Sequence, residues 1–418
     1  MLPKQSIEPS TSPDGKGWRK AFSSLQIRNY RWYWASSVSS FFGFQMQLVA
    51  RGWLIYDMTS SPLLLGIVTA AWAVPTLIIG PFGGVIADRV EKRNLIVINQ
   101  IVTVIITLVM TILIVIDAIQ IWHLMTASVL SGVVFSFNLP ARQAIVPELV
   151  GEKKLMNAIA LSSSGMNATK IVGPALAGIL VGLIGIPGVY MIVTVCYVGT
   201  VLAMLKVPPT GITVRKEKTS VMNEILYGFR YVRHNSLIRV LLTLEIIVNF
   251  LGWPYMMLMP VFARDIFGRG ASGLGLLMSA TGIGALIGSL GLAYLSDFKR
   301  RGLLLLGLFF VLGVGLILFS NCETFKLALV FLLIVGGTGT ASFALNNTLI
   351  LGNIDHEVRG RVMSIYMMTW TAEAIGVLPL GALAEAKGVS FAVSLDGALL
   401  AILAVIIVAT ASQLRKLE

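Results

Sequence analysis

Three ionisable residues lie deep inside long apolar stretches of this sequence: Lys170, Glu245 and Glu373. A charge at the centre of a bilayer costs roughly 2.5–3.5 kcal/mol, so each of these side chains must face protein or water. A carboxyl group in an apolar surround can hold a proton at neutral pH. Glu373 and Glu245 are therefore candidates for a site that a proton and a substrate occupy in turn, and Lys170 for a contact with either. The alternatives are helix-packing hydrogen bonds for the acids and a structural contact with a buried acid or carbonyl for Lys170.

Polar residues recur at helical spacing around two of these charges. The two stripes are Ser163, Asn167, Lys170 and Pro174, and Glu245, Asn249, Trp253 and Met256. Gly173 and Pro174 predict a helix bend, because proline frees backbone groups that neighbouring helices must satisfy.

A charge-dense hairpin occurs twice, half a chain apart. Residues 83–93 read GGVIADRVEKR, and a fainter copy at 291–301 reads GLAYLSDFKRR. Asp88 and Asp297 are separated by 297 − 88 = 209 residues, half of 418. A repeat of this kind predicts a two-fold membrane transporter.

The composition is that of a membrane protein. Hydrophobic residues make up 56% of the chain and charged residues 12%, against roughly 25% charged in a soluble domain. The net charge of +12 lies in short loops, which favours a topology signal over nucleic-acid binding. The sequence has no nucleotide-binding P-loop, and its two cysteines and three histidines show no metal-ligand spacing. We therefore expect no enzyme activity, cofactor, metal site or nucleic-acid partner.

The sequence predicts an all-α membrane protein with twelve transmembrane helices in two pseudo-symmetric six-helix bundles. A span needs about 20 apolar residues, and the candidate spans are 33–56, 62–87, 94–116, 121–140, 157–182, 187–206, 238–262, 272–296, 302–320, 325–350, 360–385 and 389–411. The predicted segments are a cytoplasmic start (1–32), an N-terminal bundle (33–206), a linker with an amphipathic helix (207–237), a C-terminal bundle (238–411) and a cytoplasmic tail (412–418).

Basic residues predict the orientation in the cell membrane. Of 32 lysines and arginines, 26 fall on the side that holds both termini, which predicts that both termini are cytoplasmic. Lys92 and Lys299 are interpreted as ordinary loop charges of this kind.

These features resemble the major facilitator superfamily over nearly the whole chain. The residues that match the family's hairpin motif are Gly84, Asp88, Arg89 and Arg93. The stretch GPALAG from Gly173 resembles a motif of the family's exporters. Shorter runs resemble the branch that holds macrolide-efflux and enterobactin-exporter proteins: WLIY at 53–56, TSSP at 59–62, PAR at 140–142 and LMNA at 155–158. In the second hairpin Phe298 stands where the family has arginine, which implies a weaker latch there.

The resemblance implies a gate at the cytoplasmic face. Asp88 would lie against the start of the eleventh span, where free backbone N–H groups favour an anion, with Arg142 as its basic partner. The gate residues would be Gly84, Asp88, Arg89, Arg93, Arg142 and Asp297. The alternative is that these are ordinary loop charges.

The resemblance also implies that spans 1, 4, 7 and 10 line a central cavity. Gln47 and Arg51 would face it together, unless Arg51 reaches outward to the interface instead. Candidate substrate contacts are Gln47, Arg51, Asn138, Asn167, Lys170, Asn249, Trp253, Met256, Phe343, Asn346 and Asn347. Methionine and aromatic side chains offer a pliable wall, although such residues in membrane spans more often face lipid or pack between helices. The glycines of the eighth span are interpreted as close packing.

We therefore expect a monomeric secondary active transporter that exports amphipathic or hydrophobic small molecules by alternating access, with proton antiport as its energy source. The rival interpretations are a lipid or lysolipid flippase on the same fold, a non-transporting membrane sensor and an importer.

Overall fold

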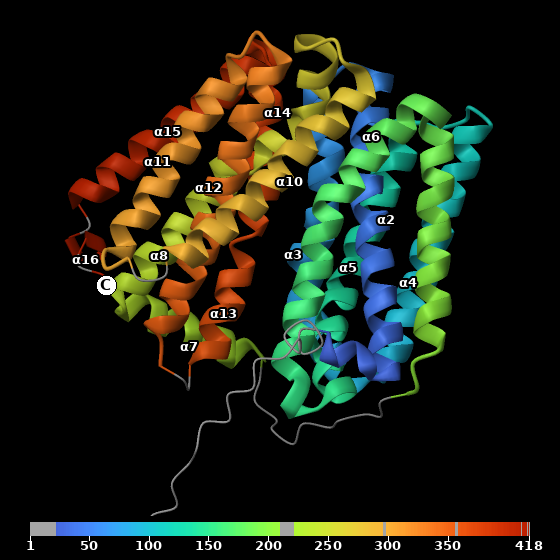
Figure 1. The fold of residues 1–418 in the computed structure, drawn as a ribbon, viewed down its shortest axis with the longest axis horizontal. Coiled ribbons are helices and arrows are strands. Elements are labelled where there is room, and N and C mark those ends of the chain that lie inside the picture. Colours follow the sequence, from blue (N-terminus) through green and yellow to red (C-terminus); the bar gives the residue numbers. More distant parts are fainter. Residues whose placement is uncertain are drawn as a thin grey trace, which may run out of the picture.

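A computed structural model describes residues 22–209, 221–295, 298–355, 358–410, 412–415 and 417 of this protein. These residues form helices and connecting turns, with no strand among them. Figure 1 shows two helical bundles side by side, one coloured blue to green and the other yellow to red, so each bundle is one half of the sequence.

The N-terminal bundle contains five continuous helices that provide six spans. A short turn, η1 (Ser23–Gln26), precedes α2 (Arg28–Thr59), α3 (Pro62–Arg89), α4 (Lys92–Val115), α5 (Ile121–Val150) and α6 (Glu152–Leu205). Gly185 interrupts α6 with a φ of 70°, a left-handed conformation that glycine adopts without steric cost. The helix therefore holds two spans, divided near the point where the sequence predicts the fifth span to end and the sixth to begin.

The C-terminal half of the chain, which starts with the linker helix, is less regular. It comprises α7 (Val221–His234), α8 (Ser236–Ile247), η2 (Val248–Gly252), η3 (Pro254–Leu258), α9 (Met259–Val261), η4 (Phe262–Ile266), α10 (Gly270–Tyr294), α11 (Arg301–Ser320), α12 (Phe325–Gly352), α13 (Arg359–Met368), α14 (Thr371–Lys387), α15 (Val389–Thr410) and α16 (Ser412–Arg415). Residues 236–266 cross as one span through α8 and the irregular turns that follow it, in a stretch where Pro254 and Pro260 lack the N–H that a regular α-helix needs. The eleventh span is divided into α13 and α14.

The predicted twelve-span fold is confirmed. Within the described residues, ten helical stretches are long and apolar enough to cross a membrane. One of them, residues 154–205, holds two spans. The more polar helix α2, which is 32 residues long, adds the twelfth.

Two local predictions are wrong. The fourth span was expected to end at residue 140, but α5 continues to Val150 with Pro140 and Pro147 inside it. The longer helix places Glu148 beside the start of α4, where Lys92 is only 4% exposed and forms an ion pair with Glu148 at 2.7 Å. Lys92 is therefore a buried structural charge that ties two helices together, and not an ordinary loop charge.

The two bundles meet at one end and separate toward the other. Their ribbons converge at the top of Figure 1 and diverge below, and α6 packs on α10 as α3 packs on α14. A Cβ atom added to Gly178 would lie 2.5 Å from the Gly275 Cα, so these backbones touch. At Gly80 and Gly291, further along α3 and α10, an added Cβ would meet no heavy atom within 4 Å.

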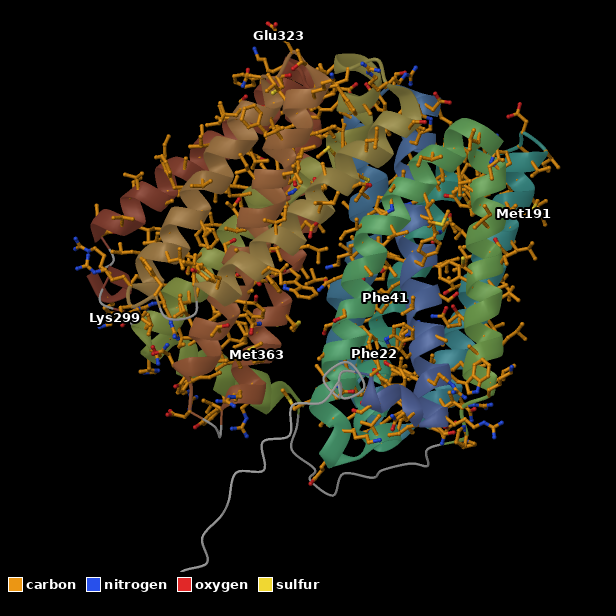
Figure 2. All side chains as sticks on the ribbon, in the orientation of Figure 1. Phe22, Phe41, Met191, Lys299, Glu323 and Met363 are labelled. Atoms are coloured by element: carbon orange, nitrogen blue, oxygen red, sulfur yellow. The ribbon has the colours of Figure 1, made fainter. Side chains whose placement is uncertain are left out.

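The linker helix α7 packs against the C-terminal bundle. The Arg361 guanidinium of α13 lies 4.7 Å from the centre of the Tyr227 ring, and the Tyr231 hydroxyl donates a hydrogen bond to Asp355 at 3.2 Å. The described part of the predicted linker is thus a helix that docks beneath the eleventh span. Figure 2 shows Lys299 near this end of the molecule and Glu323 at the opposite, closed end.

Candidate functional site

Lys170 and Glu373 lie where the contact between the bundles ends. On α6 the contact with α10 runs from Gly182, beside Ser272, to the Lys170 carbonyl, beside Gly282. The Lys170 side chain is exposed at this end of the contact, one turn from the exposed Asn167.

Glu373 occupies the corresponding place on α14. Gly381 packs against Pro62 of α3, and the Val377 carbonyl would be 3.2 Å from a Cβ at Gly66. Glu373 lies one helical turn from Val377, toward the open end, and its side chain is exposed. Glu373 and Lys170 are near enough for their charges to influence each other across the two bundles, although the ion pairs formed between described residues do not include this pair. The structure therefore brings together two of the three predicted charges, at the apex of the opening between the bundles.

Glu245 lies elsewhere, in the interior of the C-terminal bundle, where it is 2% exposed. It accepts hydrogen bonds from the Asn346 amide at 2.6 Å, the Tyr366 hydroxyl at 3.2 Å and the Asn249 amide at 3.5 Å. Asn346 also donates to the Leu241 carbonyl at 3.2 Å. This network joins α8, η2, α12 and α13, so Glu245 and its partners have a structural role in this conformation.

A second polar centre lies inside the N-terminal bundle. Gln47, Arg51, Asn138 and Arg142 all line one cavity of about 80 Å³. Arg51 donates to the Ser128 hydroxyl of α5 at 3.2 Å, so its guanidinium turns into the bundle and does not reach outward. Arg142 donates to the Asn138 side chain at 2.7 Å and to the Ser37 hydroxyl at 2.8 Å.

The other predicted cavity residues occupy the C-terminal half. Trp253 packs on Gly339 of α12, and the Phe343 ring lies 6.0 Å from the rings of Tyr366 and Trp370. Met256 is half-buried against the core, and Asn347 is half-buried one position after Asn346. These residues belong to helices of the C-terminal bundle. Their contact with a substrate stays a prediction.

Gly173 and Pro174 serve close packing on both sides of α6. A Cβ at Gly173 would lie 2.7 Å from the Gln45 Cβ of α2, and a Cβ at Gly275 of α10 would lie 2.9 Å from the Pro174 carbonyl oxygen. The helical backbone runs through both residues. Gly275, Gly282, Gly284 and Gly288 of α10 likewise meet neighbouring backbone, as the sequence predicts, whereas Gly291 does not.

The predicted cytoplasmic gate is described in part. Gly84 and Asp88 lie in α3, but the surroundings of their side chains fall outside the described residues, as does Asp297. Arg89 is exposed. Arg93 donates to the carbonyls of Leu205 and Val207 and so fastens the end of α6. Arg142 makes its contacts inside its own bundle, so its pairing with Asp88 stays a prediction for another conformation.

The closed end carries a clamp that the sequence does not predict. Glu385, near the end of α14, accepts hydrogen bonds from the Ser61 hydroxyl at 2.9 Å and the Leu63 backbone N–H at 3.2 Å, both at the start of α3. The Tyr56 hydroxyl donates to Asp265, and Arg264 donates to the Tyr56 carbonyl at 3.1 Å. These contacts join the bundles at the end opposite the opening.

The residues that complete these polar networks are not identifiable from the sequence. Tyr366, Ser37 and Ser128 complete the polar networks, yet hydroxyl residues are common in membrane helices and carry no signal of their own. Asp396, half-buried in α15, is a further acid within a span. Away from the ends of the membrane spans, the N-terminal half therefore contributes Arg51, Arg142 and Lys170, and the C-terminal half contributes Glu245, Glu373 and Asp396.

Twelve spans in two halves, with opposed charges between them, define a secondary transporter of the major facilitator type. This chain belongs to the family described as transmembrane secretion effector, whose model matches residues 19–418.

Curated relatives agree with this assignment. The chain is 25% identical over 368 residues to the staphyloferrin A transporter of Staphylococcus aureus (strain NCTC 8325 / PS 47), covering 84% of this chain and 87% of that protein. It is 23% identical to macrolide efflux protein A of Streptococcus pyogenes, covering 92% and 96%. The predicted resemblance to the macrolide-efflux branch is confirmed. The nucleoside transporter NupG shares the fold, with a TM-score of 0.73 at 14% identity over 92% of this chain and 100% of NupG.

Proposed function

We propose that this protein exports an amphipathic or hydrophobic small molecule across the cell membrane by alternating access, driven by proton antiport. Export is supported by the family's description as a secretion effector and by the relative named for macrolide efflux. In this proposal both termini are cytoplasmic, so the open end of the structure faces the cytoplasm and receives the substrate.

The proposed coupling rests on Lys170 and Glu373, which come from different bundles and lie near enough at the apex of the opening for their charges to influence each other. A carboxylate at Glu373 balances the Lys170 ammonium across the interface. A proton on Glu373 removes that balance and leaves the cation available to another partner. Because the two charges are on bodies that move relative to each other, protonation changes the energy difference between the two conformations.

The test uses inverted membrane vesicles and a panel that contains a macrolide, a siderophore and an apolar fluorescent dye. In these vesicles an acidic lumen should drive uptake of a transported compound, and a protonophore should abolish that uptake. We expect Glu373→Gln to reduce gradient-driven uptake by about tenfold or more, the range over which a positioned proton-transfer group acts. Glu323→Gln, an acid at the closed end, is the matched control. Uptake that ignores both the gradient and Glu373→Gln would remove the coupling proposal.

A further inference from the structure

The cavity inside the N-terminal bundle has an unusual combination of walls. Its volume of about 80 Å³ compares with the roughly 10–15 Å³ that one water molecule needs. Aromatic side chains form much of the wall: Phe41, Phe44, Trp72 and Phe135. The polar side includes both Arg51 and Arg142, and no lining residue is an acid. The cavity therefore offers an apolar surface and two cations to one occupant.

The Arg142 guanidinium lacks a full set of hydrogen-bond acceptors at this cavity. Its side chain is 5% exposed. Two of its nitrogens donate to Asn138 and Ser37, while Nη2 has no hydrogen-bond partner among the described residues. A buried guanidinium is costly unless an anion or a full set of acceptors compensates it. The ion pairs formed between described residues involve neither Arg142 nor Arg51.

The two arginines approach the cavity from opposite directions. Ser37, which binds Arg142, and Arg51 are 51 − 37 = 14 residues apart on α2, about 21 Å along the helix axis. Both side chains nevertheless line the same cavity. The two guanidinium groups therefore mark two ends of the cavity, that of Arg142 beside Ser37 and that of Arg51 beside Ser128.

We propose that this cavity is a subsite for the anionic group, a carboxylate or phosphate, of an amphipathic aromatic compound. The free Nη2 of Arg142 binds the anion, since the fork of an arginine matches the geometry of both groups. The aromatic walls bind the apolar body. The inference rests on the proposed export function only in naming the occupant as the transported molecule.

Binding is measured on the purified full-length protein in phosphatidylcholine nanodiscs, by quenching of tryptophan fluorescence and by calorimetry. The probes are 2-naphthoate and its neutral amide, 2-naphthamide, which share one apolar body. We expect naphthoate to bind about tenfold more tightly than the amide, the difference that one charge-assisted hydrogen bond provides. Arg142→Gln should bring naphthoate binding down to the level of the amide, and Arg51→Gln should lower it less, because the Arg51 guanidinium lies beside Ser128 at the other end of the cavity.

Controls separate charge from folding. Arg239→Gln, on an exposed arginine of α8, should leave naphthoate binding unchanged. If Arg142→Gln does not fold, Arg142→Lys keeps the charge, and it should retain part of the preference for the anion. Equal binding of naphthoate and naphthamide to the native protein would overturn the inference, and so would full naphthoate binding by folded Arg142→Gln.

A further experiment identifies the source of the anion, and the design of the binding assay separates this inference from the coupling proposal. Nanodiscs that contain phosphatidylglycerol should leave naphthoate binding intact if the natural occupant is a soluble anion, and should compete with it if the occupant is a lipid headgroup. No pH gradient enters the binding assay, so a transporter indifferent to Glu373→Gln can still show the anion site, and a coupled transporter can still fail to show it.

Discussion

At the scale of single residues, the buried acid Glu245 and the exposed acid Glu373 illustrate two different uses of a carboxyl group in a membrane span. Glu245 is surrounded by donors from three other side chains, whereas Glu373 meets a single opposed charge across a movable interface. The first arrangement stabilises one bundle. In the second, the electrostatic energy of Glu373 depends on how the two bundles lie relative to each other. Their positions in the sequence look alike, because both lie inside apolar runs long enough to span a membrane.

The Glu245 network predicts a stability effect. Asn346→Ala removes the shortest of the hydrogen bonds to Glu245, at 2.6 Å, and leaves a buried acid under-satisfied. We expect a loss of about 1–3 kcal/mol in the free energy of unfolding, measured by thermal unfolding in detergent. Thr348→Ala on the same helix is the control, because its hydroxyl is exposed and donates only to the Ala344 carbonyl of its own helix. Equal melting temperatures for the two variants would show that the network contributes little.

At the scale of elements, sequence reasoning locates helices along the chain better than it orients them. The lengths of apolar runs place the spans, and Gly185 divides the fifth from the sixth near the predicted boundary. Which way a residue faces is harder to infer, because a helix that is apolar all round offers no 3.6-residue pattern to follow. The resemblance likewise implies a gate position at the cytoplasmic face for Arg142, whereas in this structure the longer α5 places its side chain inside the bundle. The clamp at Glu385 depends on which bundle ends meet, and sequence spacing does not encode that.

The glycine contact between α6 and α10 makes a prediction of this scale. Gly275→Val should hold the two helices apart, because a Cβ at this position would lie 2.8 Å from the Gly178 Cα. The readout is a disulfide between Gly182→Cys and Ser272→Cys, in a background where Cys196 and Cys322 are replaced. A Cβ at Gly182 would lie 2.8 Å from the Ser272 hydroxyl, so the pair is close enough to cross-link.

We expect near-complete cross-linking with Gly275 and a several-fold slower reaction with Gly275→Val, since overpacking of this kind typically costs about 1–3 kcal/mol. Gly307→Val is the control, because an added Cβ there meets no heavy atom within 4 Å. An unchanged cross-linking rate in Gly275→Val would mean that the contact between α6 and α10 accommodates a larger side chain.

At the scale of the whole molecule, the clamp at the closed end joins the two bundles, and in the proposed alternating-access cycle it would set the balance between two conformations. Glu385 binds a backbone N–H at the start of α3, where the helix dipole favours a negative charge. The resemblance to the superfamily implies the same chemistry at the opposite end, with Asp88 against the start of the eleventh span. Each end would then be closed by an acid at a helix N-terminus, and only one end at a time.

Weakening the clamp should therefore shift the population of conformations. Glu385→Gln keeps the shape and removes the charge, and because the contact is exposed we expect a change of about 0.5–1 kcal/mol, or roughly two- to fivefold in the equilibrium. Spin labels at Met58 and Lys387, both exposed near this end, report the distance between α2 and α14 by double electron–electron resonance. Glu323→Gln should leave the distance distribution unchanged, and an identical distribution in Glu385→Gln would show that the clamp does not set the balance.

The separation of charge between the halves also bears on how the protein is made. Arg51, Arg142 and Lys170 enter the bilayer with the first six spans, before Glu245, Glu373 and Asp396 have been synthesised. Each uncompensated charge raises the cost of membrane insertion, so the first half waits in lipid as a cationic intermediate. Synthesis of the eleventh span then supplies Glu373, so Lys170 meets an opposed charge only after most of the second half has been made.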